Sequence, residues 1–510
     1  MALLTNAPVL VVGAGLMGAG IAQVAAQAGH PVWLHDARED AAHSAKTKLS
    51  AVFDGLVNKG RLTTEAAAET LARIQPTKHL GEAANAALVV EAIIEDLKAK
   101  QALFAELEGI VATSAVLATN TSSISITAIA NGLKHPGRVV GMHFFNPVPL
   151  MNLVEVVAGL QTEALVAENI ADLARAWGKT AVHARSTPGF IVNRIARPYY
   201  AETWALLLER AAEPQVIDAC LRGAGFRMGP CELMDLVGHD TNLAVTCSIY
   251  DANYQDKRYQ PSLLQRERVD GGLLGRKTGR GFYTYPAGAQ ALPVALHAAP
   301  TTAAEVVVHG DGPIAHHLEQ AATQALAAQG WGPARQHGSG WTGLSIDGAR
   351  LMLTDGRSAS AVAQSIGSGD VAVFDRVLNL PSAPGTALAF AVAAQASSTW
   401  RHQAQAWLAA LGFAPQALAD TPGLVVARTV AMLINEAADA VHQGVCTPEG
   451  ADAAMKLGVN YPVGPFEWLA TWPTQHLVAL LEALDTHYRG ERYRVSPWLR
   501  ERAYSSGNPT

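Results

Sequence analysis

The first 150 residues alternate between short apolar runs and longer stretches in which polar and apolar positions recur with a helical period. The apolar runs have the length of buried strands; they are residues 9–12, 31–35, 88–91, 116–119 and 138–144. The stretches between them, such as 19–28 and 38–60, indicate helices. This alternation is typical of a parallel sheet covered by helices on both faces.

The pattern changes near residue 185, where long helical stretches replace the strands. Thr187 and Pro188 predict a helix start, because threonine is a good N-cap and proline fits the first turn. Helices are expected to about residue 269, followed by a loop rich in Gly, Lys and Arg at 271–285.

The second half of the chain repeats the first in weakened form. Thr187-Pro-Gly-Phe-Ile-Val-Asn-Arg194 returns as Thr421-Pro-Gly-Leu-Val-Val-Ala-Arg428, and Gly229-Pro-Cys-Glu232 returns as Gly464-Pro-Phe-Glu467. We therefore expect an α/β protein of two sheet-plus-helix halves. Its expected segments are a sheet domain at 1–185, an all-α domain at 186–285, a linker at 286–302, a reduced sheet domain at 303–412 and a second α-helical domain at 413–510.

A glycine motif connects the first strand to the first helix. Gly13-Ala-Gly15-Leu16-Met17-Gly18 has the GxGxxG spacing. The first glycine makes a tight turn, the second lets the backbone approach a pyrophosphate, and the third lets helix and strand pack closely. The N–H groups that open the helix then favour phosphate. The motif predicts a Rossmann-like dinucleotide-binding domain; the alternative is a glycine-rich turn without a ligand.

Asp36 ends the next strand, where an acid holds the ribose 2′-OH of a dinucleotide. It favours NAD over NADP because it would repel a 2′-phosphate, although Arg38 lies close by. The matching turn of the second half, Gly310-Asp-Gly312-Pro, places a negative charge and a residue without N–H at the phosphate position. We expect this degenerate Rossmann-like domain to bind no nucleotide.

One histidine and one glutamate stand out among apolar neighbours. His143 ends an apolar strand next to two prolines, and Glu155 lies twelve residues later in Leu-Val-Glu-Val-Val. A buried carboxylate needs a partner because desolvating it alone is costly, and His143 is the nearest candidate. Asn120-Thr-Ser122-Ser123 follows another strand, so its polar groups are expected at the same edge of the sheet.

Composition narrows the function classes. The chain is 49% apolar with a net charge of −6, which gives no reason to expect nucleic acid. Its four cysteines show neither CxxC spacing nor a metal-ligand pattern, as in a reducing cytoplasm. The uncharged stretch 9–28 lacks a preceding Lys or Arg and contains two glutamines, so we expect neither export nor a membrane span.

These features together resemble the 3-hydroxyacyl-CoA dehydrogenase family. The resemblance covers residues 8–285, in family order, and rests on segments 13–18, 90–95, 120–123, 143–149, 153–157, 187–194 and 275–283. The duplicated second half resembles bacterial double-module members that act on 3-hydroxyadipyl-CoA in phenylacetate catabolism. The resemblance implies NAD-dependent oxidation of a 3-hydroxyacyl-CoA thioester, such as 3-hydroxyadipyl-CoA or 3-hydroxybutyryl-CoA, as in fatty acid β-oxidation.

The resemblance also implies roles for single residues. His143 would be the general base, Glu155 would orient it, and Ser122 and Asn193 would hydrogen-bond the substrate oxygen. Lys59 would lie near the CoA phosphates. The cofactor-contacting positions implied beyond the glycine motif and Asp36 are Glu95, Lys100, Asn120, Ser122, Asn146 and Lys277.

Structural roles remain open for each of these residues. His143 and Glu155 could form a purely structural pair, and Ser122 or Ser123 could cap a helix. Asn193 could satisfy a backbone carbonyl, and Lys59 could stabilise a helix end.

Arg222 and Arg227 depart from the family pattern and add positive charge beside the expected acyl pocket, which suggests a substrate with a distal carboxylate. The second half lacks a counterpart of His143 and is expected to be non-catalytic. Its helices would pack on residues 186–270 as an intramolecular pseudo-dimer, and a homo-oligomer is possible. The competing hypotheses are a dehydrogenase of free hydroxy or sugar acids and a non-catalytic protein that kept the fold.

Overall fold

The computed structural model describes residues 6–290, 292, 300 and 303–505. Most of the expected linker, 286–302, lies outside the described residues. The chain divides into two compact units. The first unit holds the residues up to Arg194 together with 443–459, and the second holds 195–442 and the residues from 460 onward.

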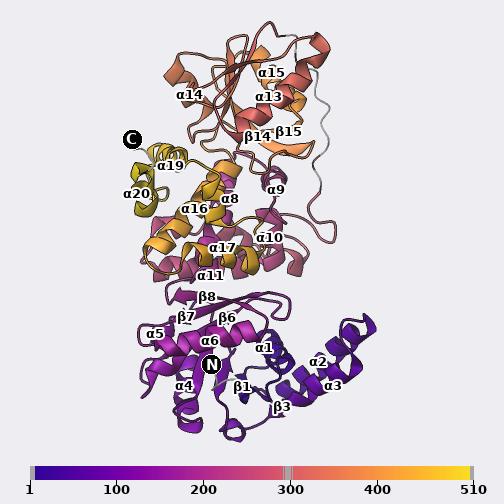
Figure 1. Cartoon of the computed structure of the whole chain (residues 1–510), viewed down its shortest axis with the longest axis vertical. Coiled ribbons are helices and arrows are strands. Elements are labelled where there is room, and N and C mark those ends of the chain that lie inside the picture. Colours follow the sequence, from indigo (N-terminus) through magenta and orange to yellow (C-terminus); the bar gives the residue numbers. More distant parts are fainter. Residues whose placement is uncertain (1–5, 291, 293–299, 301–302, 506–510) are drawn as a thin grey trace. The chain divides into compact units, whose positions relative to one another are not determined.

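The first unit is built on an eight-stranded sheet of order β3-β2-β1-β4-β5-β6-β7-β8 (Figure 1). Its strands are β1 Val9–Val12, β2 Val32–His35, β3 Ile74–Thr77, β4 Leu88–Glu91, β5 Val116–Thr119, β6 Val139–Phe144, β7 Leu153–Ala158 and β8 Thr180–Arg185. All neighbours are parallel except β6 and β7. Strands β1, β4 and β5 are buried along their whole length, as expected for a sheet covered on both faces.

Helices cover this sheet. They are α1 Leu16–Gln27, α2 Ala41–Asn58, α3 Thr64–Arg73, α4 Leu97–Ile110, α5 Ile126–Ile129, α6 Ala164–Ala176, α7 Val192–Ile195 and α17 Pro448–Val459, with 3₁₀ turns η1 Leu80–Ala83 and η2 Pro136–Arg138. The predicted alternation of strands and helices is confirmed. Helix α1 begins earlier than expected, at Leu16, directly after the glycine turn.

The predicted helix start at Thr187 is wrong. Residues 187–191 form a turn in which Gly189 and Phe190 have positive φ angles of +78° and +47°, and α7 starts only at Val192. A left-handed backbone cannot continue into a helix, so Thr187 caps nothing. The first N–H groups of α7 are accepted instead by Glu155 Oε1, which lies 3.1 Å from Ile191 N and 2.9 Å from Val192 N.

The second unit contains a second sheet of order β10-β9-β11-β12-β13-β14-β15. Its strands are β9 Val306–His309, β10 Ala334–Gln336, β11 Gly343–Ile346, β12 Ala349–Leu353, β13 Val371–Phe374, β14 Thr386–Val392 and β15 Phe413–Ala417. Helices α13 Pro313–Leu326, α14 Ala359–Ile366 and α15 Ser398–Ala410 and the 3₁₀ turn η5 Ala327–Gln329 accompany it. Strand β11 runs antiparallel to β9 and β12, so this reduced domain is a mixed sheet.

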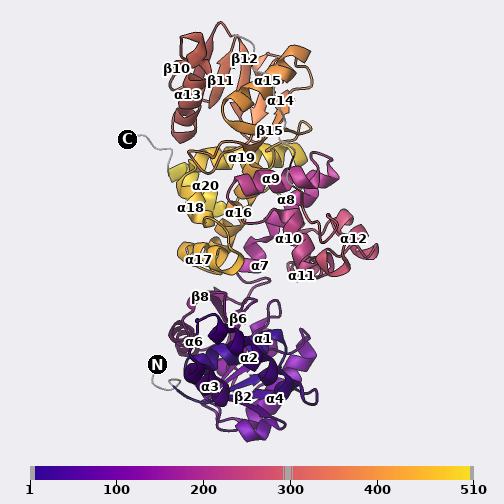
Figure 2. The same cartoon turned by 90° about the vertical axis from the view of Figure 1, so that its right-hand side faces the viewer.

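The remaining helices come from both halves of the chain (Figure 2). They are α8 Arg197–Leu208, α9 Pro214–Gly223, α10 Pro230–Val237, α11 His239–Ala252, α12 Leu263–Asp270, α16 Val426–His442, α18 Pro465–Ala470, α19 Thr474–Tyr488 and α20 Pro497–Ser505, with 3₁₀ turns η3 Lys257–Tyr259 and η4 Arg276–Thr278. Helix α16 packs on α8 and is buried over nearly its whole length.

Membrane spans and metal-binding clusters are both absent from the described residues. None of their helices is long and apolar enough to cross a membrane. Within the same residues, no cluster of three His, Cys, Asp or Glu side chains could hold a metal ion.

Candidate functional site

The glycine turn after β1 has the geometry that a phosphate cradle needs. Gly13 has φ +106°, and a Cβ on it would lie 2.4 Å from the Ala92 carbonyl oxygen. A Cβ on Gly18 would lie 1.7 Å from the Gly13 carbonyl oxygen. Only a glycine at position 18 therefore lets α1 pack this closely against the turn. A Cβ on Gly15 would meet nothing within 4 Å. Gly13 and Gly18 shape the turn, and Gly15 faces open space where a ligand can approach the backbone.

Asp36 ties the end of β2 to this turn. Its Oδ2 accepts the Ala14 N–H at 2.7 Å, and its Oδ1 accepts the Arg38 backbone N–H and Nε–H at 2.9 Å. The Arg38 side chain is the main cause that lowers the pKa of Asp36 to about 2, against the opposing effect of burial. The carboxylate is therefore ionised at neutral pH.

A cleft of about 490 Å³ opens at the carboxyl ends of β1, β2 and β3. Its walls include Val12, His35, Ala37, Leu80, Ile93 and Leu103, with Lys78 and Glu106 as charged residues. An apolar cleft beside Asp36 fits the flat ring of an adenine. Most of these wall residues could not be predicted to lie together, because they come from separate strands, helices and loops.

A second buried carboxylate organises the loop after β4. Glu91 is fully buried; its Oε1 accepts Lys100 Nζ at 2.6 Å and its Oε2 accepts Thr119 Oγ1 at 2.6 Å. Lys100 is 1% exposed and also lies 3.3 Å from Glu95 Oε2. Lys100 therefore holds Glu91 and Glu95 in place. Sequence reasoning missed the partnership of Glu91, although Glu91 ends an apolar run as visibly as Glu155 interrupts one.

Glu95 collects the polar groups that follow β5. Its Oε1 accepts Thr121 Oγ1 at 2.7 Å, the N–H of Ser122 at 2.9 Å and the N–H of Ser123 at 3.1 Å. Burial acts to raise the pKa of Glu95, but the Thr121 hydrogen bond and the charge of Lys100 outweigh it and lower that pKa. Ser122 Oγ lies 3.3 Å from the same oxygen, which leaves this half-buried hydroxyl only weakly engaged.

His143 and Glu155 lie directly opposite each other in the antiparallel pair β6–β7. His143 Nδ1 is 2.6 Å from Glu155 Oε2, and the two residues are 5% and 0% exposed. The contact predicted from the sequence is confirmed. Because the second Glu155 oxygen accepts two N–H groups at α7, the carboxylate is fixed from both sides. The ring of Phe145 packs 4.6 Å from that of His143.

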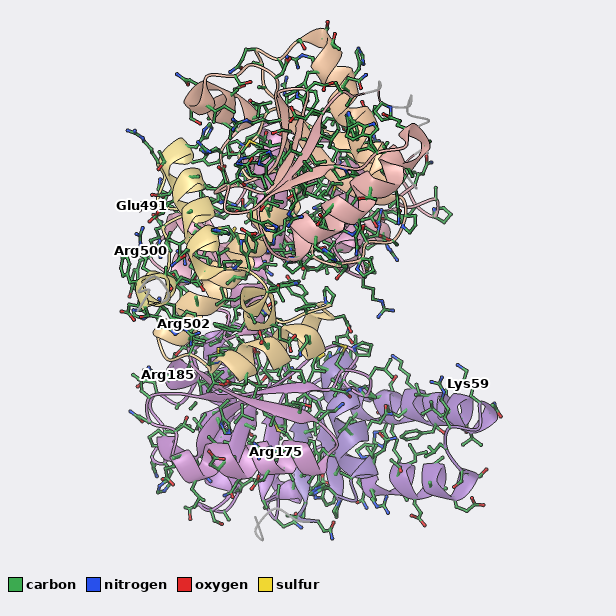
Figure 3. All side chains as sticks on the ribbon, turned by 45° about the horizontal axis from the view of Figure 1, so that its top comes forward. Lys59, Arg175, Arg185, Glu491, Arg500 and Arg502 are labelled. Atoms are coloured by element: carbon green, nitrogen blue, oxygen red, sulfur yellow. The ribbon has the colours of Figure 1, made fainter. Side chains whose placement is uncertain are left out.

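The other expected site residues of the first unit differ in how firmly they are held. Asn120 Oδ1 accepts the Phe144 N–H at 2.8 Å, which links the ends of β5 and β6. Asn193 is half-buried in α7, immediately after Val192, whose N–H binds Glu155. Asn146 is exposed in the loop after β6. Lys59 is exposed at the tip of the α2–α3 hairpin (Figure 3).

Three expected residues belong to the second unit. Lys277 Nζ is 2.6 Å from Asp240 Oδ2, and this ion pair lowers the pKa of Asp240. Arg227 is exposed, whereas Arg222 Nη1 donates to Glu232 Oε2 at 3.1 Å. The expectation of two available positive charges is therefore corrected: Glu232 compensates Arg222.

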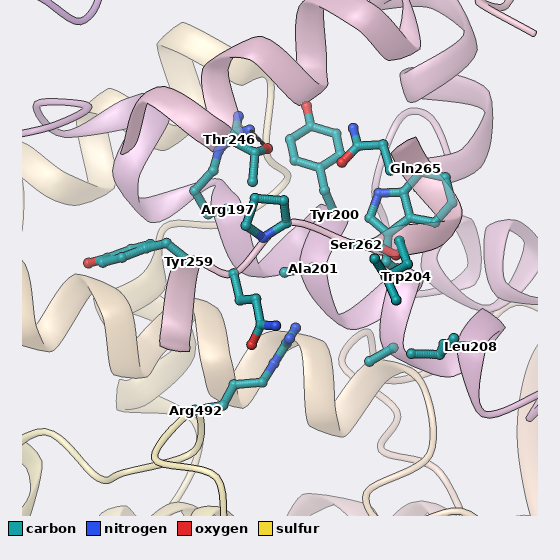
Figure 4. Close-up of a pocket in the computed structure, with 14 residues that line it drawn as sticks. Arg197, Tyr200, Ala201, Trp204, Leu208, Thr246, Tyr259, Ser262, Gln265 and Arg492 are labelled. Atoms are coloured by element: carbon teal, nitrogen blue, oxygen red, sulfur yellow. Dashed lines mark hydrogen bonds between the residues drawn. The ribbon is translucent and has the colours of Figure 1, made fainter. Parts of the chain in front are cut away.

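The second unit also contains a cavity of about 210 Å³ between α8 and the segment 259–265, which links η3 to α12 (Figure 4). Tyr200, Trp204 and Tyr259 supply aromatic walls, with Arg197 and Arg492 at its edge. Neither a glycine turn nor a histidine–carboxylate pair lines it, so we do not count it as part of the candidate site.

The second half contains a carboxylate that caps the start of a helix, as Glu155 does in the first half. Asp375, at the end of β13, accepts the N–H groups of Val425, Val426 and Ala427 at the start of α16. Burial raises the pKa of Asp375 to about 6 despite these hydrogen bonds. Its hydrogen bonds in the structure come from backbone N–H groups, and the described residues pair it with no histidine, so this site retains the anchor without a base.

The chain matches the models of known protein families over most of its length. Residues 8–187 match the NAD binding domain of 3-hydroxyacyl-CoA dehydrogenase, and residues 189–285 and 423–507 match the C-terminal domain. Residues 351–422 match the reduced Rossmann-fold domain of 3-hydroxybutyryl-CoA dehydrogenase.

Full-length and half-length relatives both match. The chain is 44% identical to 3-hydroxyadipyl-CoA dehydrogenase of Escherichia coli over 97% of both chains. It is also 44% identical to a probable 3-hydroxybutyryl-CoA dehydrogenase of Deinococcus radiodurans, which covers 54% of this chain and 99% of its own. A crystal structure of 3-hydroxybutyryl-CoA dehydrogenase from Escherichia coli superposes with a TM-score of 0.87 at 42% identity, over 98% of this chain and 99% of its own. This chain is an NAD-dependent enzyme that belongs to the 3-hydroxyacyl-CoA dehydrogenase family.

Proposed function

We propose that this protein oxidises 3-hydroxyacyl-CoA to 3-oxoacyl-CoA, with His143 as the general base and Glu155 as its orienting partner. The observation that carries the assignment is the buried 2.6 Å contact between His143 Nδ1 and Glu155 Oε2. A proton on Nδ1 that is donated to the carboxylate leaves the Nε2 lone pair available for a substrate hydroxyl.

The residues present fit a nicotinamide dinucleotide. The open backbone at Gly15 suits its pyrophosphate, and Asp36 suits the adenosine ribose. A bound NAD would supply the hydride acceptor for C3 of the substrate. His143 Nε2 takes the proton of the 3-hydroxyl as the C3–O bond becomes a carbonyl. Glu155 then stabilises the imidazolium, and Ser122 and Asn193 hold the oxygen so that the transfer is aligned.

The acid at the ribose position gives a first prediction. Asp36→Ala removes a charged acceptor whose hydrogen bonds are typically worth about 1.5–3 kcal/mol. We expect the Kd for NAD, measured by fluorescence titration, to rise by roughly ten- to a hundred-fold. NADP binding should suffer less, because the repulsion of its 2′-phosphate also disappears. Equal losses for both dinucleotides would mean that Asp36 only supports the glycine turn through Ala14.

We further propose a dicarboxylic acyl substrate of the 3-hydroxyadipyl-CoA type. The names of the relatives alone leave this open, since one refers to 3-hydroxyadipyl-CoA and others to 3-hydroxybutyryl-CoA. The chain's own support is Arg227, which is exposed in the turn after α9 and, unlike Arg222, forms no ion pair among the described residues. Lys59 and Lys277 would contact the CoA phosphates and the cofactor, respectively.

A substrate panel tests both proposals. Arg227→Ala should lower kcat/KM for 3-hydroxyadipyl-CoA by roughly ten-fold or more, because a charge-assisted contact is lost. The value for 3-hydroxybutyryl-CoA should stay nearly constant. Arg222→Ala is the matched control. Equal losses on both esters would remove the dicarboxylate argument, and turnover of free hydroxy acids but not CoA esters would favour the other dehydrogenase class.

We propose that the second half replaces a partner subunit. Helix α16 packs on α8 within one chain, and Asp375 has no histidine among its described partners. The second half would then support the first half without catalysing the reaction itself. The four free cysteines support a reducing compartment such as the cytoplasm.

A further inference from the structure

The two helical copies are related by a pseudo-twofold arrangement in the second unit. Arg258 Nη1 and Tyr259 OH of the first copy donate to Glu436 of the second, at 3.2 and 2.6 Å. Arg492 Nη2 and Tyr493 OH of the second copy donate to Glu202 of the first, at 3.0 and 2.9 Å. Each residue is offset by 234 positions from its counterpart. Such reciprocal contacts are the mark of an isologous interface.

The same reciprocity extends to the sheets. Helix α9 of the first copy packs on β14 of the second sheet, where a Cβ on Gly223 would lie 3.0 Å from Thr386 Cγ2. Helix α17 of the second copy packs on β7 and β8 of the first sheet. Each helical copy therefore covers strands from the opposite half of the chain, and this exchange brings residues 443–459 into the first unit.

Helix α17 contacts the surroundings of the histidine–glutamate pair through one glycine. A Cβ on Gly458 would lie 2.7 Å from Leu153 Cδ2, 3.0 Å from Val192 Cγ2 and 3.6 Å from Phe145 Cε1. Val192 donates its N–H to Glu155, and Phe145 packs on His143. Leu153 begins β7, two residues before Glu155.

The segment before α17 contacts α7 and the end of β8. Gln443 Oε1 accepts Arg194 Nη1 at 2.9 Å, and the Val445 carbonyl accepts the Arg185 N–H at 2.9 Å. Cys446 follows these two residues in the chain. Burial raises the pKa of its thiol to about 12, so it is a neutral packing residue there.

We propose that residues 443–459 complete the dehydrogenase centre of the first half, with Gly458 and Gln443 as positioning residues. They hold Phe145 and α7 against His143 and Glu155, so the second half of the chain contributes directly to the rate of hydride transfer. The inference rests on the proposed role of His143. Its physical basis is preorganisation, because a small misplacement of a catalytic pair lowers the rate steeply.

The test compares the two reciprocal glycine contacts in the full-length chain. Gly458→Val should lower kcat by roughly ten- to a hundred-fold, and Gly458→Ala by less, because the added atoms displace Val192 and Phe145. The Kd for NAD should not change, since the glycine turn and Asp36 follow β1 and β2, away from Gly458. Gly223→Val, at the contact of α9 with β14, is the matched control: it should lower the melting temperature but not kcat.

Two further results keep the inference testable. Should Gly458→Val not fold, Gln443→Ala, which removes one hydrogen bond to Arg194, should still lower kcat by several-fold with an unchanged Kd for NAD. Wild-type kcat in Gly458→Ala and Gln443→Ala, or equal kcat losses at Gly458 and Gly223, would overturn the inference. A wild-type chain that oxidises no 3-hydroxyacyl-CoA would instead overturn the proposed function, so the two failures are distinguishable.

Discussion

Replacing His143 by glutamine is expected to lower kcat for 3-hydroxyacyl-CoA oxidation by roughly a thousand-fold, which corresponds to about 4 kcal/mol of transition-state stabilisation. Glutamine keeps a polar group next to Glu155 but cannot accept the hydroxyl proton. NAD should bind as in the wild type, because the glycine turn and Asp36 are untouched. Steady-state formation of NADH measures the first effect, and fluorescence titration measures the second.

His183 provides the control for this variant. It lies on β8 with 43% of its side chain exposed and only a 3.6 Å contact to Glu168. His183→Gln should therefore leave kcat unchanged. A His143→Gln enzyme with more than a tenth of the wild-type kcat would require another base.

Glu155→Gln is expected to lower kcat by roughly a hundred- to a thousand-fold. The amide keeps the size of the side chain and one oxygen for the Ile191 and Val192 N–H groups. It removes the negative charge that stabilises the imidazolium, and its NH₂ group facing Nδ1 would favour the wrong tautomer of His143. The KM for NAD should stay constant, and kcat measured by NADH absorbance should carry the loss.

A variant of Asp375 separates the structural contribution of Glu155 to kcat from its chemical contribution. Its carboxylate caps α16 as Glu155 caps the start of α7, but it has no histidine among its described partners. Asp375→Asn should therefore change the melting temperature without changing kcat. If Asp375→Asn and Glu155→Gln lowered kcat equally, the role of Glu155 would be structural.

Local features of this chain were largely predictable from its sequence. The glycine turn and Asp36 follow from spacing, because the turn and the strand end leave few conformations open. The His143–Glu155 contact follows from a single rule, that a carboxylate among apolar residues needs a partner. The same rule applied to Glu91 would have found Lys100. The role of His143 as a base stays a prediction until its variants are measured.

Features that depend on distant partners were not predictable. The turn at 187–191 looked like a helix start, because nothing local shows that a carboxylate from β7 caps α7. The amphipathic pattern of α17 shows which of its residues should be buried. It does not show that these residues pack on β7 and β8 of the other half of the chain. The expected charge of Arg222 was compensated by Glu232, ten residues away in the next helix.

The exchange of helices supplies a physical reason for the proposal that the second half of the chain is non-catalytic. A half that positions the first half through residues 443–459, as proposed, would need neither a dinucleotide site nor a catalytic histidine. The carboxylate of Asp375 remains because it holds α16, which packs on α8. Loss of catalytic residues and retention of the interface are then compatible.

The central claim is that His143, oriented by Glu155, accepts the hydroxyl proton as hydride leaves C3. Its most direct test is a single turnover with enzyme in excess over 3-hydroxyacyl-CoA, carried out with protium or deuterium at C3, in the wild type and in His143→Gln. Rapid NADH formation with a primary isotope effect is expected in the wild type, and formation slower by roughly a thousand-fold is expected in the variant. Equal single-turnover rates in the two proteins would contradict it.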